Sequence, residues 1–335
     1  MSRRSASPKG TARVAVVGST TVPGTRLRQM LAELGVPGSR VELYSATDAS
    51  EPILSEYDGE ARLIQTPDLD ELLARDVVFL CETGKLVAQV IDRAASAITA
   101  IDVANVRAAA TGATLVHMDV NPQAVVGPGG LFAIPHDLST LLADLLYPLE
   151  RELGLAEVVA TILRPVSDFG EAGIEELRDQ TVRLLNFTDP QTEVFGRQLA
   201  FNVLPQSASP DGSESIESRV ATEVGSLIGW DDRRMTVGLA VAPVFFGHCL
   251  SLCLRFGREI TSDRLREVLM NAGLSASNDG ADRLTPMDVS SEDGIHVSGV
   301  SDDGRGGFRI WAVAGGVHRR TADLAVRLAA ALCDL

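Results

Sequence analysis

The sequence predicts an α/β protein of two domains, the first built on a parallel sheet and the second on a mostly antiparallel sheet. Three observations carry this prediction. The chain has 335 residues, more than one hydrophobic core normally organises. Its first third alternates short strand patterns with helical patterns, which is typical of a parallel sheet covered by helices on both faces. The remainder carries longer strand patterns interspersed with helices, which indicates an α+β domain.

The strand and helix patterns of the first domain begin at residue 13. Residues 13–18 (RVAVVG) are apolar, β-branched and closed by Gly, as expected of a buried parallel strand. Apolar residues at helical spacing then predict an amphipathic helix: Leu27, Met30, Leu31 and Leu34. Further strands are predicted at 41–45, 77–81 and 98–103, and a helix over 85–97.

A leucine stripe opens the second domain and predicts a helix: Leu138, Leu141, Leu142, Leu145, Leu146 and Leu149. Asp137 is placed to cap its start, and Pro148 is expected to bend or end it. Later strands are predicted at 158–164, 235–246, 250–256, 295–300 and 308–313, and helices over 170–185, 215–227 and 262–270.

The last helix is predicted over 317–332 and is expected to pack back on the first domain. The predicted organisation is a disordered tail over 1–12, a first domain over 13–134, a second domain over 135–314 and a C-terminal segment over 315–335.

The charge balance excludes several classes of partner. Thirty Lys and Arg against 45 Asp and Glu give a formal net charge of −15, which repels nucleic-acid backbones and anionic membrane surfaces. No apolar run reaches the ~18 residues that a membrane span needs. The four cysteines, without a signal peptide, predict reduced thiols and a cytoplasmic location.

No metal site is expected. Cys249 and Cys253 share one face of a predicted strand while His248 lies on the other, so the three side chains do not converge on one ion.

The turn after the first strand carries a glycine pattern in VAVVGSTTVPG. Gly18 ends the strand and Gly24 starts the helix, as in loops whose backbone approaches a pyrophosphate. Thr21 stands at the middle position, where the closest approach occurs. Two interpretations remain open: a tight turn without a ligand, or a dinucleotide loop formed by Gly18, Thr20, Thr21, Val22, Pro23 and Gly24.

Seven motifs, in this order, resemble those of aspartate-semialdehyde dehydrogenases. They read VAVVGSTTVPG, VNPQA, AIPHDLSTLLADLLYPL, VSDFGEAGIEELRDQT, RQLAFNVLPQ, APVFFGHCLSL and IWAVAGGVHRR. The resemblance covers about residues 12–332. It implies a Rossmann-type NAD(P)-binding domain followed by an α+β dimerisation domain, an NADP-dependent oxidoreductase of amino-acid biosynthesis, and a homodimer formed through the second domain.

The resemblance also identifies positions at which this chain departs from the family's chemistry. In the family a thiolate attacks the aldehyde, a His moves protons, hydride passes to NADP, and phosphate releases the acyl group. Aligning Pro135 and Pro148 with the family's two prolines places Asp137 at the nucleophilic Cys and His136 at the neighbouring Asn. A carboxylate is a poor nucleophile towards an aldehyde and cannot form the thioester that phosphate cleaves. Asp137 is therefore either a helix cap or a residue with other chemistry.

His248 stands at the family's acid/base His and is the one catalytic position retained. The family's catalytic Gln falls on Arg164, and a Gly that lets the backbone close on the cofactor falls on Asp168. The Arg that binds the substrate carboxylate falls on Val241. His248 is open to two interpretations, a working residue or a remnant.

Contacts with phosphate and cofactor differ as well. The substrate-phosphate Arg falls on Ala108, next to Arg107. Ser45 and Thr47 occupy the family's Ser-x-Arg contact with the NADP 2′-phosphate, and Gly315-Gly316 replaces the pair that contacts nicotinamide. Binding of NADP or NAD is therefore expected to be weak. Thr47 brings no positive charge for the 2′-phosphate of NADP, and Thr21 brings a Cβ to where the backbone must meet the pyrophosphate.

Three hypotheses follow. The first is a catalytically silent paralogue kept for binding or for subunit pairing, as a homodimer or with an active family member. The second is an active NAD(P)-dependent oxidoreductase that acts on another aldehyde or oxo group through His248. The third is the ordinary enzyme with a displaced thiol. Candidate residues for the dimer surface, or alternatively for the domain core, are Leu199, Phe201, Val203 and Leu204.

Overall fold

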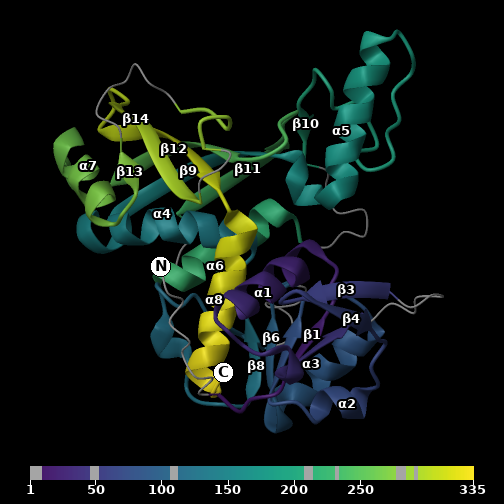
Figure 1. The fold of residues 1–335 in the computed structure, drawn as a ribbon. Coiled ribbons are helices and arrows are strands. Elements are labelled where there is room, and N and C mark those ends of the chain that lie inside the picture. The colour runs from purple at the N-terminus through teal and green to yellow at the C-terminus, as the bar shows by residue number, and fades with distance from the viewer. Residues whose placement is uncertain are drawn as a thin grey trace, which may run out of the picture. The chain divides into compact units, whose positions relative to one another are not determined.

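The computed structural model describes residues 10–45, 53–105, 112–206, 214–230, 234–276, 284–289 and 293–335 (Figure 1). The chain divides into two compact units. Unit 1 comprises the described residues up to Thr140 together with His318–Leu335, and unit 2 comprises Leu141–Val317. The predicted site residues Thr47, Arg107 and Ala108 lie outside the described residues.

Unit 1 is built on a six-stranded sheet in the order β2-β1-β5-β6-β8-β7, in which all neighbouring strands are parallel. This confirms the predicted α/β class. The strands are β1 (Val14–Val17), β2 (Val41–Tyr44), β5 (Val77–Leu80), β6 (Thr99–Asp102), β7 (Thr114–Leu115) and β8 (Gly130–Ala133). All residues of β1, β5 and β6 are buried, as in a sheet covered on both faces.

Helices cover both faces of this sheet. On one face, α1 (Val22–Glu33) and α8 (Val317–Leu332) contribute Leu27, Leu31 and Leu328 to one buried cluster. On the other, α3 (Lys85–Ala97) and the short α2 (Leu69–Leu73) contribute to a second cluster. Leu34, expected in the stripe of the first helix, instead lies beyond its end and is 56% exposed, because Gly35 follows with φ of +82°.

A separate hairpin of β3 (Ile53–Tyr57) and β4 (Glu60–Ile64) was not predicted. Asp58 and Gly59 form its two-residue turn with φ of 51° and 79°. A two-residue turn with both φ positive matches the twist of antiparallel strands, and Asp-Gly is one of its preferred sequences.

The leucine stripe forms α4 (Asp137–Leu153), and its six leucines are at most 3% exposed. Of the two outcomes expected at Pro148, a bend or an end of the helix, the end is wrong, since α4 continues to Leu153. Leu149 and Leu153 are buried beyond the proline. Their burial offsets the lost backbone hydrogen bond.

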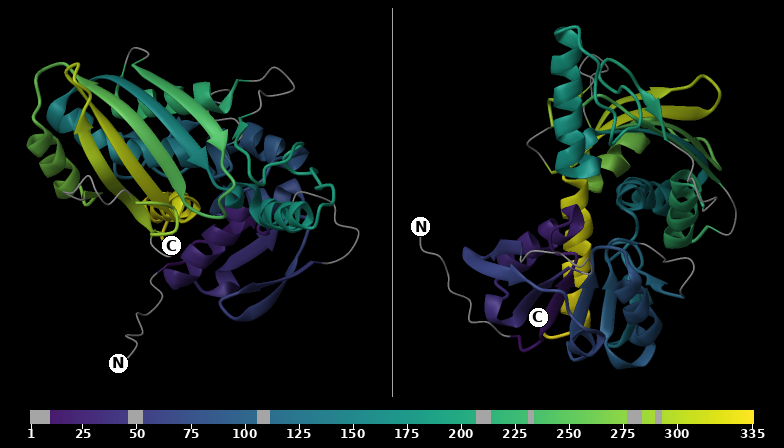
Figure 2. Two further views of the ribbon diagram at one scale, coloured as in Figure 1. Left: turned by 90° about the horizontal axis from the view of Figure 1, so that it is seen from above. Right: turned by 90° about the vertical axis from the view of Figure 1, so that its right-hand side faces the viewer.

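Unit 2 is built on one seven-stranded sheet in the order β10-β11-β9-β12-β15-β14-β13 (Figure 2). Four of its six neighbouring pairs are antiparallel, as predicted. The strands are β9 (Leu155–Arg164), β10 (Leu204–Pro205), β11 (Met235–Val241), β12 (His248–Phe256), β13 (Ser275–Ala276), β14 (Gly294–Asp302) and β15 (Gly307–Gly315). β11 ends earlier than predicted, at Val241, because Pro243 follows.

The helices of unit 2 are α5 (Gly170–Leu185), α6 (Ile216–Ile228) and α7 (Ser262–Asn271). The sheet buries alternate residues, and α4 and α6 lie against the same face of it (Figures 1 and 2). In β9, buried Val158, Ala160 and Ile162 alternate with exposed Val159 and Thr161.

Within the described ranges, no helix combines the length and apolar character that crossing a membrane requires.

Candidate functional site

Three residues singled out from the sequence meet in unit 2. Arg164 ends β9, His248 begins β12, and Asp168 lies between them in the 3-10 turn η3 (Val166–Phe169). Oδ2 of Asp168 accepts from Arg164 Nε at 2.9 Å and lies 3.0 Å from His248 Nε2. All three side chains are at most 10% exposed. An ionised carboxylate only accepts hydrogen bonds, so Nε2 of His248 carries the proton in this contact.

Two further side chains hold Arg164 in place. Its Nη1 donates to Gln206 Oε1 at 2.9 Å, and its guanidinium lies 5.1 Å from the ring centre of Phe169. Val241, which the motif alignment matched to the family's substrate-carboxylate Arg, lies in the apolar core of unit 2 and is 5% exposed.

Asp137 belongs to unit 1, where its carboxylate binds α8. Oδ2 lies 2.6 Å from Nδ1 of His318, and Oδ1 accepts from the hydroxyl of Thr321. These partners lie 181 and 184 positions away in the sequence. Asp137 thus connects the first turn of α4 to the first turn of α8, where the helix N-termini favour a negative charge.

The expectation that Asp137 caps α4 is wrong. Asp137 is already the first helical residue, and His136 precedes it. Leu138 N donates to Nδ1 of His136 at 3.1 Å, and Thr140 N donates to the carbonyl of His136 at 2.8 Å. His136 therefore fills the capping role, and the Asp137 carboxylate turns to α8.

The surroundings of Asp137 keep it ionised. Burial alone would raise its pKa, but the charge and hydrogen bond of His318, then the charge of His136 and the hydrogen bond of Thr321, lower that pKa to about 2. A carboxylate already engaged in these bonds is poorly placed to attack a carbonyl.

We expect the free energy of unfolding to fall at low pH because Asp137 becomes protonated. Its folded pKa of about 2 lies below the ordinary 3.8, so its contribution is complete above about pH 4 and disappears as the pH falls through 2. The stability gap between wild type and Asp137→Asn, about 2 kcal/mol at pH 5 by this linkage, should close near pH 2. Urea unfolding from pH 5 to pH 2 measures it. A gap that stays constant with pH contradicts the ion pair, and His318→Gln should reduce the gap at pH 5.

Two of the cysteines are unsuited to replace a missing thiolate. Burial raises the pKa of the Cys249 thiol to about 11. Burial, and then the charges of Asp102 and Glu82, raise the pKa of Cys81 far above its usual range. Both thiols therefore stay protonated near neutral pH, which disfavours the displaced-thiol hypothesis for them.

In the glycine turn of unit 1, residues 18–24, several backbone N–H and C=O groups are hydrogen-bonded within the unit. The hydroxyl of Thr21 caps α1 by accepting from Gly24 N at 3.2 Å, and it lies 2.8 Å from the Gly18 carbonyl and 2.9 Å from the Cys81 carbonyl. Gly18 N and Ser19 N both donate to the Tyr44 carbonyl. A Cβ on Gly24 would lie 2.0 Å from the Gly18 oxygen, so the strand-to-helix packing itself requires this glycine.

The remaining cofactor candidates are spread over both units. Thr20, Val22 and Pro23 belong to the same turn, and Ser45 at the end of β2 is 8% exposed and donates its N–H to Gln65. In unit 2, Gly316 has φ of +63°, and a Cβ there would lie 2.1 Å from Asp293 Oδ1. Packing against Asp293 thus accounts for this glycine without a nucleotide.

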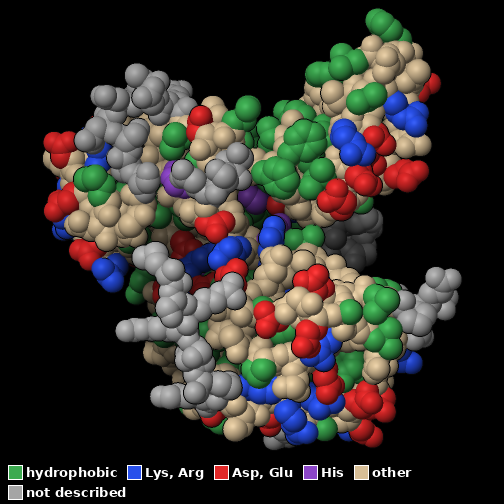
Figure 3. All heavy atoms as spheres, in the orientation of Figure 1, with side chains coloured by type: hydrophobic (Ala, Val, Ile, Leu, Met, Phe, Trp, Pro, Cys, Tyr) green, Lys and Arg blue, Asp and Glu red, His purple; other side chains and the backbone are tan. Residues whose placement is uncertain are grey.

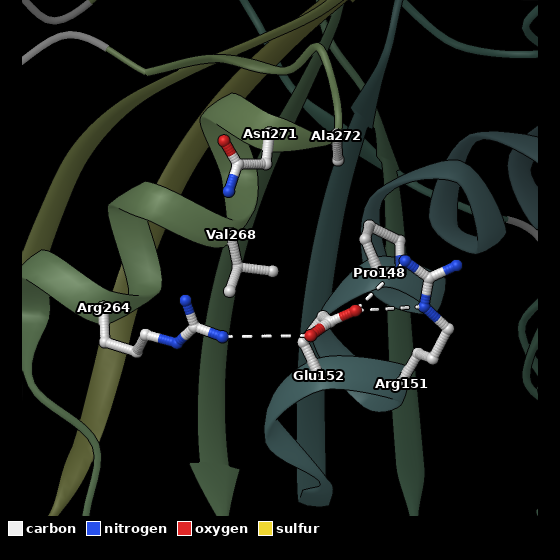
Figure 4. A pocket seen from close by; sticks show the side chains of 7 residues that line it. All are labelled: Pro148, Arg151, Glu152, Arg264, Val268, Asn271 and Ala272. Atoms are coloured by element: carbon white, nitrogen blue, oxygen red, sulfur yellow. Dashed lines mark hydrogen bonds and ion pairs between the residues drawn. The ribbon is translucent and has the colours of Figure 1, made fainter.

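A pocket of about 160 Å³ lies between α4 and α7 in unit 2 (Figure 4). Glu152 projects into it and accepts from Arg151 at 3.1 Å, while Arg264 approaches the same carboxylate to 3.8 Å (Figure 4). The charges at the rim of this pocket neutralise one another, and their side chains are 40% to 63% exposed. We assign no ligand to it.

Comparison with known proteins identifies the family. The family model described as the dimerisation domain of semialdehyde dehydrogenases matches residues 146–317, a little over half of the chain. The chain belongs to the semialdehyde dehydrogenase family. A second model, the NAD-binding domain of semialdehyde dehydrogenases, matches residues 13–127.

Several relatives of this semialdehyde dehydrogenase family member match it over most of its length. An aspartate-semialdehyde dehydrogenase from Rickettsia conorii is 28% identical over 300 residues, or 87% of this chain and 88% of the relative. The USG-1 protein homolog from Pseudomonas aeruginosa is 27% identical over 325 residues, or 94% and 96% of the two chains. The crystal structure of aspartate semialdehyde dehydrogenase II from Vibrio cholerae shares the fold, with a TM-score of 0.82 and 24% identity over 96% of this chain and 98% of that one.

These comparisons confirm the resemblance to aspartate-semialdehyde dehydrogenases and the predicted pair of domains. Sequence reasoning missed three residues that complete the two networks: Gln206, His318 and Thr321. The only signal for the last two was their spacing of three on one predicted helix, which places them on a common face.

Proposed function

We propose that this semialdehyde dehydrogenase family member is a catalytically silent paralogue that serves by pairing subunits through its second domain. The observation that carries the proposal is the engagement of both key side chains in internal networks. Asp137, at the nucleophile position, binds His318 and Thr321, and His248, at the acid/base position, faces Asp168. A reacting group must be within reach of its substrate, and these groups are already bonded within the chain.

The apolar surface of unit 2 supports the pairing. Of the four candidates from the sequence, Leu199 and Leu204 lie in the core at 0% and 8% exposure, so they are not surface residues. Phe201 and Val203 are 70% and 53% exposed. Additional exposed apolar residues lie on α5 and directly after it: Val182, Leu185 and Phe187. Figure 3 shows hydrophobic side chains on the surface of the part of unit 2 that contains α5. Exposed aromatic residues are enriched at the centres of protein interfaces.

Backbone strain marks two of these residues. Phe187 follows the C-cap of α5 with φ of +57°, a position usually taken by Gly, and its side chain is 100% exposed. Phe201 has φ of +63°. The left-handed conformation costs a non-glycine residue about 1–2 kcal/mol. Because the exposed rings gain little from packing within the chain, burial against a second copy is the compensation that fits them.

We expect the protein to be a homodimer, and Phe201→Asp to weaken it at least about 30-fold, the loss of one interface hot spot. Sedimentation velocity across a micromolar concentration series measures the dissociation constant. Leu54→Asp is the matched control, because Leu54 is 74% exposed and lies in the hairpin of unit 1.

A wild-type monomer at micromolar concentration contradicts the homodimer. If Leu54→Asp weakens the dimer as much as Phe201→Asp does, the dimer surface does not lie at Phe201. If a wild-type monomer pairs only after an active family member is added, the paralogue serves as one half of a heterodimer.

We expect NADP to bind with a dissociation constant above about 10 µM. The N–H groups of Gly18, Ser19, Thr21 and Gly24 donate within the unit, so the turn has fewer amides to offer a pyrophosphate. Calorimetric titration with NADP and NAD in parallel measures this. Low-micromolar binding of NADP contradicts the prediction, and a preference for NAD supports a residual nucleotide site, since NAD has no 2′-phosphate to neutralise.

A further inference from the structure

Two buried side chains with nitrogen donors, one from β9 and one from β12, converge at one edge of the sheet of unit 2. β9 and β12 are antiparallel neighbours, with Leu163 paired to Cys249, so the last residue of β9 and the first of β12 lie at the same edge. Arg164 and His248 occupy these two positions with side chains 10% and 5% exposed. Gln206 orients the guanidinium through its 2.9 Å hydrogen bond to Nη1.

A different element supplies the carboxylate that these donors hold. Asp168 belongs to η3, a single turn that is tied to the segment before β12 by the bonds from Val166 N to Val244 O and from Ser167 N to Phe245 O. One oxygen of Asp168, Oδ2, receives both contacts, from Arg164 Nε at 2.9 Å and from His248 Nε2 at 3.0 Å. The strands thus provide the donors and the turn provides the anion.

The donors recognise a carboxylate group, whichever molecule supplies it. Nitrogen donors of Arg and His form short, charge-assisted hydrogen bonds with a carboxylate, and burial strengthens them by excluding water. A buried guanidinium left without an anion is strongly unfavourable. The arrangement is therefore a built anion site rather than a surface ion pair.

We propose that Arg164 and His248, positioned by Gln206, form a carboxylate-binding centre, and that Asp168 is its resident ligand. The Asp168 side chain keeps external carboxylates out of this centre. The ligand class of the centre is a small carboxylate of the size of formate or acetate, since the space available is that of one side-chain carboxyl group. The proposal holds whether or not the protein pairs subunits.

The test is chemical rescue of Asp168→Ala, which removes the resident carboxylate and leaves its space. Thermal unfolding is followed in sodium formate, sodium acetate and sodium chloride at equal ionic strength. We expect formate or acetate to raise the midpoint of the variant by about 5 °C or more relative to chloride. Wild type, and the double variant Arg164→Met/Asp168→Ala as matched control, should show no such difference.

The same salts are used in refolding from urea, in case Asp168→Ala does not fold without an anion. Recovery of the native circular dichroism in formate or acetate, and not in chloride, then supports the centre. Absence of any carboxylate-specific effect on midpoint or refolding overturns the proposal, and so does an equal effect on the double variant. All variants are compared between salts at one protein concentration, so that subunit association contributes equally to both arms. None of these readouts requires turnover, and a failed proposal here leaves the proposed function to its own tests.

Discussion

Assayed with aspartate semialdehyde, NADP and phosphate, the purified protein is expected to reduce no measurable NADP. Removing the nucleophile of a covalent enzyme costs on the order of 10⁶ in turnover. Under the proposed alignment the nucleophile position falls on Asp137, whose pKa of about 2 keeps it a carboxylate bonded to His318 and Thr321. A carboxylate cannot form the thioester that phosphate cleaves.

An active relative, assayed beside it, provides the reference rate. Turnover above roughly 1% of that rate contradicts the silent paralogue, since it far exceeds what loss of a nucleophile leaves. Hydride transfer with another aldehyde, abolished by His248→Ala, favours instead an active oxidoreductase that works without a covalent intermediate.

Asp137→Cys alone is not expected to restore turnover. In the same proposed alignment, Val241 stands where the family has the Arg that binds the substrate carboxylate, and Arg164 and Asp168 stand at the family's Gln and Gly. Holding the substrate close to the nucleophile contributes a large part of an enzyme's rate. A thiolate beside a substrate whose carboxylate is not bound therefore adds little turnover.

The sequence predicted the elements whose own residues define them, and it missed short strands that depend on a neighbouring strand. The bounds of α5 and α8 coincide with the predicted ranges 170–185 and 317–332. Buried apolar residues define α8, whereas the buried face of α5 includes Glu176 and Gln180. β8 (Gly130–Ala133) and β7 were missed. Each is short, and pairing with a parallel neighbour rather than its own sequence makes it a strand.

The site was predicted residue by residue but not as networks. Arg164 and Asp168 each appeared as the loss of a family contact, whereas the structure pairs them with one another and with His248. Arg164 ends a strand and Asp168 lies four residues later in a 3-10 turn, so no helical or strand period in the sequence predicted their contact. Asp137 was expected to cap its own helix, because nothing local signals partners 181 and 184 positions away.

The pairing of Arg164 with Asp168 has a consequence for stability. Replacing one member of a buried ion pair leaves the other uncompensated and typically costs 3–5 kcal/mol. Asp168→Ala leaves a guanidinium beside an imidazole and should reach about that cost. Arg164→Met should cost less, about 1–3 kcal/mol, because Asp168 keeps its bond to His248. The double variant should cost clearly less than the sum of the two single variants.

Urea unfolding of the wild type, both single variants and the double variant gives the coupling energy, which should exceed about 2 kcal/mol. The matched control is the cycle on Arg319 and Glu33, an ion pair at 2.8 Å whose side chains are 48% and 51% exposed. Solvent screening should hold that coupling below about 1 kcal/mol. Equal couplings in the two cycles would mean that the Arg164–Asp168 contact is no stronger than a surface pair. A large difference would mean that Arg164 and Asp168 stabilise one another well beyond what two exposed charges achieve.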